Sequence, residues 1–118
     1  MKPFPEEFEL TDFFKSEPIL ADAGVPWAYN RLKFIRKIGE DIVECEIAPG
    51  YETLKFRWIQ KGTETINLDL NHVSGLEIQN SNGREVLHIH FQSRSRFLPL
   101  RIQFVPSIQV ELRHDGSL

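Results

Sequence analysis

The sequence predicts an all-β protein with one short helix, because apolar and polar side chains alternate along most of the chain after residue 29. A period of two residues is typical of strands that bury one face and expose the other. Breaks of two to six residues separate the runs, and such short links favour hairpins over parallel crossovers. We therefore expect an antiparallel, meander-rich β-sandwich or a partly open β-barrel of seven or eight strands, with a short N-terminal helix.

Four runs between residues 31 and 70 alternate most regularly, and we expect their apolar sets to face inward. These sets are Leu32, Phe34 and Ile38, then Val43, Cys45 and Ile47, then Leu54, Phe56 and Trp58, then Ile66, Leu68 and Leu70. The exposed charges change sign from run to run: Arg31 and Lys33, Glu44 and Glu46, Lys55 and Arg57, then Asp69 and Glu77. Opposite charges on neighbouring antiparallel strands stabilise their pairing by a few tenths of a kcal/mol each, so this pattern favours a meander.

The second half of the chain contains the strongest hairpin signal, at residues 80–83 (Asn-Ser-Asn-Gly). Asparagine and glycine tolerate the positive φ angles that tight hairpin turns require. The inward sets expected around this turn are Leu76 and Ile78, then Leu87, Ile89 and Phe91, then Leu98, Leu100, Ile102 and Phe104, then Ile108, Val110 and Leu112.

Residues 5–16 predict the helix. Pro5 suits a first helical turn, and Glu6 and Glu7 suit the positive end of the helix dipole. Three apolar side chains then share one face at helical spacing: Leu10, Phe13 and Phe14. We expect this helix to pack on the sheet or to plug one end of a barrel.

The length of 118 residues predicts a single domain, and the charge is unevenly distributed along it. Residues 1–26 carry six acidic and two basic side chains, whereas residues 27–118 carry eleven acidic and twelve basic ones. We expect the acidic helix and loop of residues 1–26 to pack on the β-domain of residues 27–118. Neither part has the basic excess that nucleic-acid binding requires, so no nucleic-acid partner is predicted.

The single cysteine, Cys45, excludes an intramolecular disulfide and a zinc site of four cysteines. It lies on an expected apolar face, where a thiol behaves as a small hydrophobic group and not as a nucleophile. No apolar stretch is long enough to cross a membrane, and the first residues lack the pattern of a secretory signal. These features predict a cytoplasmic protein with no membrane partner.

His88 and His90 form the sharpest local motif, because residues two apart on a strand share a face at about 6.5–7 Å, a spacing that two ligands of one metal can use. The pair resembles the His-x-His of the cupin metal site. Gly83, however, stands five residues before His88 where cupins have a glycine six before, and Arg94 stands where a cupin glutamate is expected. Metal binding is therefore an alternative hypothesis, and we expect no metal or other cofactor.

Trp27 and Tyr29 are the better candidates for an interaction surface, because they lie where the N-terminal segment meets the first strand. Amphipathic aromatic side chains at element ends are enriched at protein interfaces. The structural alternative is that Trp27 anchors the helix to the sheet. Arg94 and Arg96, in a polar loop, are further candidates, since they could contact a phosphate or an acidic partner surface.

The sequence thus favours a non-catalytic, small β-rich domain that binds another protein, because it holds no recognisable catalytic cluster. One alternative is a carrier or sensor that holds a small molecule inside a β-barrel. The other is a metal-binding protein that uses His88 and His90. A homodimer that pairs through an edge strand is a further expectation.

Two stretches alternate apolar and polar residues in a way similar to a known class of proteins: residues 66–78 (INLDLNHVSGLEI) and 98–112 (LPLRIQFVPSIQVEL). This pattern resembles that of small β-rich immunity proteins of bacterial toxin systems, although it contains no defining motif. The resemblance implies a cytoplasmic protein whose partner is a toxin that it blocks.

Overall fold

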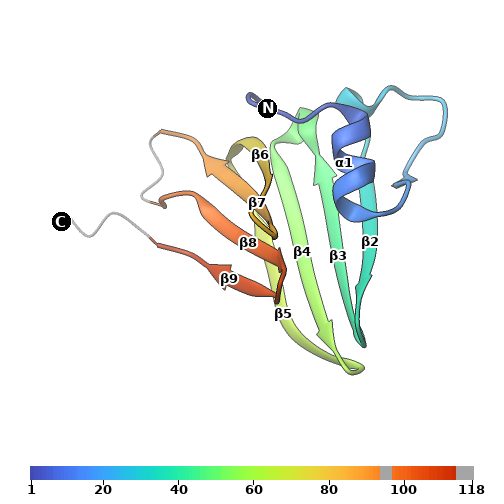
Figure 1. The fold of residues 1–118 in the computed structure, drawn as a ribbon. Coiled ribbons are helices and arrows are strands. Elements are labelled where there is room, and N and C mark those ends of the chain that lie inside the picture. Colours follow the sequence, from blue (N-terminus) through green and yellow to red (C-terminus); the bar gives the residue numbers. More distant parts are fainter. Residues whose placement is uncertain (94–96, 114–118) are drawn as a thin grey trace. The chain divides into compact units, whose positions relative to one another are not determined.

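The computed structural model describes residues 1–93 and 97–113, and Figure 1 shows the path of the chain. Its contacts form two compact units, one of Leu10–Asn71 and one of Met1–Glu9 with His72–Leu118. Within the described residues there are nine strands, all paired antiparallel, in one sheet of five and one of four, together with one short α-helix. The predicted antiparallel all-β class with a short N-terminal helix is confirmed.

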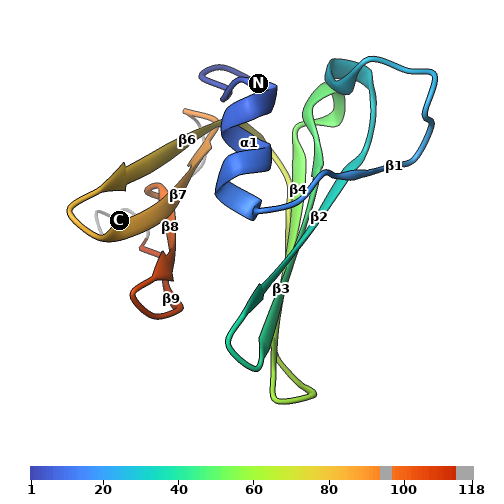
Figure 2. The same cartoon turned by 45° about the vertical axis from the view of Figure 1, so that its right-hand side comes forward.

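The first unit holds the five-stranded sheet, whose spatial order β1-β2-β3-β4-β5 follows the chain. Its strands are β1 (Ile19–Leu20), β2 (Leu32–Ile38), β3 (Asp41–Ala48), β4 (Thr53–Gln60) and β5 (Thr63–Leu70). Each strand pairs with the next one along the chain, and short turns join β2 to β3, β3 to β4 and β4 to β5, so the sheet is the meander that the alternating charges favoured (Figure 2). The two-residue strand β1 was not predicted.

The observed register places the alternating charges opposite one another. Lys33 lies opposite Glu46, Glu46 opposite Lys55, and Lys55 opposite Asp69. In the adjacent row Glu44 lies opposite Arg57. The charge pattern therefore predicted the strand neighbours correctly within this sheet, whereas Glu77, the last member of the series, lies on β6 (Val73–Ser81) of the other sheet.

The buried face of this sheet carries the helix α1 (Glu7–Phe14) from Leu10 onward. Leu10, Phe13 and Phe14 are all buried, as predicted, and the ring of Phe14 stacks on that of Phe34 with centroids 4.5 Å apart. The central strands supply the rest of the core: Leu32, Phe34, Val43, Cys45, Ile47, Leu54 and Phe56. Ile66, Leu68 and Leu70 lie on the edge strand β5 and are only half-buried, because a sheet edge has neighbours on one side.

Arg36 was overlooked by the sequence analysis, although its place in β2 puts it on the apolar face. The residue is buried, and its Nη1 donates a hydrogen bond of 2.6 Å to the carbonyl oxygen of Phe13. The last turn of α1 contains no basic residue of its own. Arg36 therefore supplies the positive charge that stabilises the negative end of a helix.

The second unit holds the four-stranded sheet in the order β6-β7-β8-β9. After β6 its strands are β7 (Arg84–Phe91), β8 (Leu100–Val105) and β9 (Gln109–Glu111). The predicted hairpin joins β6 to β7, and its two turn residues Asn82 and Gly83 have φ angles of 55° and 73°. Leu98 and Leu112, predicted to face inward, are exposed because they lie beyond the ends of β8 and β9.

Lys2 and Pro3 form an N-terminal arm that pairs with β6 in this same unit. The amide of Lys2 donates to the carbonyl of Ser74, and the amide of Leu76 donates to the carbonyl of Pro3, each at 2.8 Å. Gly75, between those two residues, makes the close approach possible, since a Cβ there would lie 2.6–2.7 Å from backbone atoms of the arm. The segment of residues 1–26 is therefore divided between the two units.

Neither sheet closes on itself in the part of the chain that the structure describes. The edge strands are β1 and β5 in one sheet and β6 and β9 in the other, and no ladder joins the two edges of either sheet. The hypothesis that a closed β-barrel encloses a ligand is therefore wrong, because neither sheet of the described residues forms a barrel. Within the described residues, no helix has the length and apolar character needed to span a membrane.

Candidate functional site

The two aromatic residues predicted as an interaction surface occupy different environments. Both lie on the single-turn 3₁₀ helix η1 (Trp27–Tyr29). Trp27 is half-buried and packs edge-on against the ring of Phe34, with centroids 6.1 Å apart. Tyr29 is 77% exposed. Trp27 therefore anchors this turn to the sheet, and Tyr29 is the residue that the turn presents to solvent.

A second exposed tyrosine, Tyr51, lies on the neighbouring turn η2 (Pro49–Tyr51) and was missed by the sequence analysis. It is 69% exposed, and the guanidinium carbon of Arg31 lies 5.4 Å from the centre of its ring. The two turns touch closely, since a Cβ on Gly50 would lie 3.2 Å from the carbonyl oxygen of Ala28. The sequence predicted a break at Pro49-Gly50. The residues around this break did not indicate that it would contact the turn of Trp27–Tyr29.

Asn30 holds the loop that carries Tyr29 and Arg31. Its buried side chain donates hydrogen bonds to the carbonyl oxygens of Asp22 at 2.6 Å and Val25 at 2.9 Å. Its Oδ1 accepts from the amides of Asp22 at 3.2 Å and Arg31 at 2.9 Å. Because all of these bonds reach backbone atoms, the side chain of Asn30 fixes the path of this loop.

A shallow groove of about 170 Å³ continues from Arg31 along the edge of the sheet. Its lining combines apolar and charged residues: Ile19, Leu20, Ala21, Arg31, Lys33 and Glu46. Ile19 is one of the large apolar side chains that stay exposed. The volume is below the roughly 300–1,000 Å³ of pockets that enclose small molecules, so the groove suits a protruding side chain of a partner better than a ligand.

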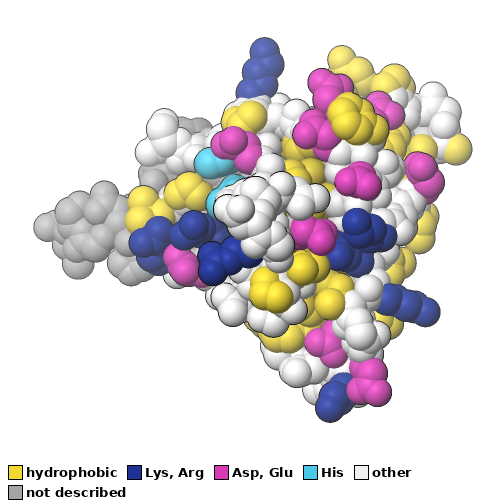
Figure 3. All heavy atoms as spheres, in the orientation of Figure 1, with side chains coloured by type: hydrophobic (Ala, Val, Ile, Leu, Met, Phe, Trp, Pro, Cys, Tyr) yellow, Lys and Arg dark blue, Asp and Glu magenta, His cyan; other side chains and the backbone are white. Residues whose placement is uncertain are grey.

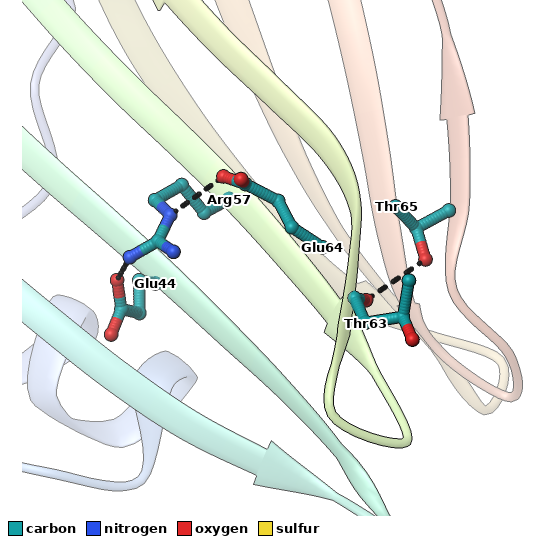
Figure 4. A network of polar contacts seen from close by, with 5 residues as sticks. All are labelled: Glu44, Arg57, Thr63, Glu64 and Thr65. Atoms are coloured by element: carbon teal, nitrogen blue, oxygen red, sulfur yellow. Dashed lines mark hydrogen bonds and ion pairs between the residues drawn. The ribbon is translucent and has the colours of Figure 1, made fainter.

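The outward face of the same sheet is covered by paired charges. Arg57 on β4 lies between Glu44 and Glu64, with its Nη1 2.8 Å from Glu44 Oε2 and its Nε 2.9 Å from Glu64 Oε1 (Figure 4). The hydrogen bond to Glu64, followed by the charge of Glu44, raises the pKa of Arg57 above its usual value. Ion pairs between neighbouring strands account for these charges. This part of the face therefore gives no indication of a ligand site.

His88 and His90 lie on the outward face of β7 in the other sheet, and both are half-buried. Figure 3 shows histidine side chains beside acidic and basic ones on the visible face of the molecule. Each ring already has a partner on β6: His88 Nε2 lies 2.9 Å from Gln79 Oε1, and His90 Nε2 lies 2.7 Å from Glu77 Oε1. Among residues 1–93 and 97–113, no three histidine, cysteine or acidic side chains come together as a metal cluster. Metal binding by this pair stays a prediction.

The pKa of His88 is lowered by burial first, then by the charges of Arg101 and His90, while Glu77 acts in the opposite direction. Arg101 lies directly opposite His88 in the register. The folded protein therefore binds this proton less tightly than the unfolded chain, and the contribution of His88 to stability falls as the pH drops below the ordinary pKa of 6.5.

We expect Arg101→Gln to raise the pKa of His88 towards 6.5, because the substitution removes a nearby positive charge. An NMR titration of the histidine ring resonances measures this shift directly. Arg57→Gln, on the other sheet, is the control and should leave the titration unchanged. A pKa of His88 that does not rise in the Arg101→Gln protein would show that Arg101 does not act on this ring.

The remaining candidates give two further results. Arg94 and Arg96 lie outside the described residues, so their role as contact residues stays a prediction.

Cys45 is buried, as expected, and burial raises the pKa of its thiol far above the usual range, with a smaller contribution from the charge of Glu46. Since the thiolate is the reactive form of cysteine, this side chain is not a nucleophile.

Comparisons with known proteins identify the fold and no family. The chain matches no family profile and no curated protein. Among solved structures it is similar to a chain of a contact-dependent growth inhibition toxin–immunity protein complex from Klebsiella pneumoniae 342. The two chains share 18% sequence identity with a TM-score of 0.77, over 93% of this chain and 94% of the other. At this identity the likeness shows that the two chains share a fold.

Proposed function

We propose that this chain is an immunity protein: a non-catalytic domain that binds a bacterial toxin domain and blocks it. The observation that carries the proposal is the likeness, across nearly the whole length of both chains, to a chain of a toxin–immunity protein complex. That complex contains a toxin and an immunity protein. The choice between these two roles therefore depends on the side chains of the present chain.

The side chains favour the immunity role over the toxin role. The charged residues on the outward face of the first sheet neutralise one another across the strands, as Arg57 does with Glu44 and Glu64. The single cysteine is buried with a raised pKa. Exposed tyrosines beside an arginine, in contrast, are the side chains that dominate binding at protein interfaces.

A growth assay tests the proposal. The chain is expressed in bacteria alone and together with each member of a panel of contact-dependent growth inhibition toxin domains, including that of the Klebsiella complex. We expect the chain alone to leave growth unchanged, and to restore growth against one toxin domain. That toxin domain should also co-purify with it as a stoichiometric complex.

Two outcomes would contradict the proposal. Growth arrest by the chain itself would assign it the toxin role, and failure to neutralise any toxin domain of the panel would remove the immunity role. A native mass spectrum of the chain alone examines the other predictions, since it reports a metal on His88 and His90, a retained small molecule, or a homodimer paired through an edge strand.

A further inference from the structure

The end of the first sheet near η1 and η2 exposes side chains of the kinds that usually anchor a protein interface. Tyr29 and Tyr51 are both largely exposed, and Ile19 nearby is 59% exposed. Tyrosine and arginine supply most of the binding energy in many interfaces, whereas other contact residues contribute little. We call Ile19, Tyr29, Arg31 and Tyr51 the tyrosine patch.

The tyrosine patch is ordered by polar contacts as well as by the packing of Trp27 on Phe34. Asn30 holds the backbone between Tyr29 and Arg31 through its hydrogen bonds to the loop. The guanidinium of Arg31 lies over the ring of Tyr51 and 3.6 Å from Glu46 Oε1. A surface that is already ordered loses less conformational entropy when a partner binds, which favours tight association.

The positive charge of the groove next to the tyrosine patch indicates which kind of partner side chain the patch binds. Arg31 and Lys33 line the groove with one carboxylate, Glu46, so the groove carries an excess of positive charge although the whole chain has a net charge of −3. Arginine has five N–H donors, and the ion pair with Glu46 uses one nitrogen. A carboxylate on the partner would find donors here next to the face of the Tyr51 ring.

We propose that the tyrosine patch is the surface through which this chain holds its toxin domain, by receiving an apolar side chain flanked by a carboxylate. This inference rests on the proposed immunity function and names the site that performs it. Tyr51 and Tyr29 supply the apolar contact area, and Arg31 pairs with the carboxylate. Trp27 and Asn30 act indirectly, since they hold the turns in place.

The test uses the full chain and the toxin domain that it neutralises in the growth assay. Dissociation constants are measured by isothermal titration calorimetry for the wild type and for Tyr29→Ala, Tyr51→Ala and Arg31→Ala. We expect Tyr51→Ala to weaken binding by about 30-fold or more, and Arg31→Ala by about 10-fold. Arg31→Ala should also reduce the salt dependence of binding, because it removes one charge pair from the interface.

Arg101→Ala is the matched control, because Arg31 and Arg101 have the same exposure and the same ion-pair distance to a glutamate. Each side chain is 48% exposed, and each lies 3.6 Å from a glutamate on the neighbouring strand. Arg101 belongs to the other sheet, so its replacement should change binding by less than about threefold. Circular dichroism of every variant checks that a loss of binding is not a loss of folding, and Tyr51→Phe, which keeps the ring, should retain most of the affinity.

Failure of this inference and failure of the proposed function give different results. If the wild type neutralises a toxin domain and the three alanine variants bind it as tightly as the wild type, the tyrosine patch is not the site and the immunity role stands. An equal loss in Arg31→Ala and Arg101→Ala would also overturn the assignment of the site. If the wild type neutralises no toxin domain, both proposals are wrong.

Discussion

Replacing Phe14 with alanine is expected to lower the free energy of unfolding of the first unit by about 3–5 kcal/mol. The side chain is fully buried and lies between two aromatic rings, edge-on to Phe13 at 5.2 Å and stacked on Phe34 at 4.5 Å. Alanine would leave a cavity between the helix and the sheet, and it would remove both ring contacts. Loss of this contact would also weaken the attachment of α1 to β2.

Urea unfolding followed by tryptophan fluorescence measures this effect, because Trp27 and Trp58 both belong to the Leu10–Asn71 unit. Phe8→Ala provides the control, since Phe8 lies on the same helix but is 72% exposed. Its replacement should cost less than about 1 kcal/mol. Equal losses from the two substitutions would mean that α1 does not use its Leu10, Phe13 and Phe14 face to pack on the sheet.

The second large effect is expected from Gly75→Ala. The added Cβ would lie 2.6–2.7 Å from backbone atoms of Lys2 and Pro3, and backbone cannot move aside as a flexible side chain can. The N-terminal arm must therefore leave β6, with the loss of its two backbone hydrogen bonds. Each such bond contributes about 0.5–1.5 kcal/mol, so the second unit should lose roughly 1–3 kcal/mol.

Hydrogen exchange at the amide of Leu76 detects the change, because that amide donates to Pro3 in the intact protein. We expect it to exchange faster in the Gly75→Ala protein, while the amides of β7 stay protected. Gly24→Ala serves as the comparison, since a Cβ at Gly24 meets only a side-chain oxygen of Asp22 at an ordinary 3.7 Å. An amide of Leu76 that remains fully protected in Gly75→Ala would contradict the role of this glycine.

Alternation along the chain was enough to predict which apolar side chains of the first sheet face inward and which of the strands from β2 to β5 are neighbours. Cys45 and Ile47 are buried opposite the buried Phe56 and Leu54, as the period of two required. The pattern succeeds here because each strand pairs with the next one along the chain. The side-chain period and the short turns then determine the register together.

Features that depend on distant residues could not be predicted in this way. Arg36 lies on the apolar face because its partner is a helix carbonyl 23 residues earlier in the chain. The N-terminal arm finds β6 only because Gly75 leaves room for it. Leu98 and Leu112 continue the apolar alternation beyond the strand ends, where there is no core left to cover them.

The candidate site was predicted in part. Tyr29 was identified from the sequence because an amphipathic aromatic residue precedes the first long strand. Its neighbour Tyr51 is 22 positions further along, and only the contact between η1 and η2 brings the two turns together. The buried amide of Asn30 was overlooked because its acceptors are backbone atoms of a loop, which leave no periodic signal in the sequence.

The N-terminal arm has a consequence for the order in which the protein is made. A ribosome completes the continuous segment Leu10–Asn71 first, and its five strands pair only with sequence neighbours, so this unit can form from local contacts while synthesis continues. Lys2 and Pro3 emerge before that segment, but their partners Ser74 and Leu76 emerge after it. Lys2 and Pro3 are therefore translated before the first sheet but find their place after it, because the arm can join the fold only when the strand β6 has been made.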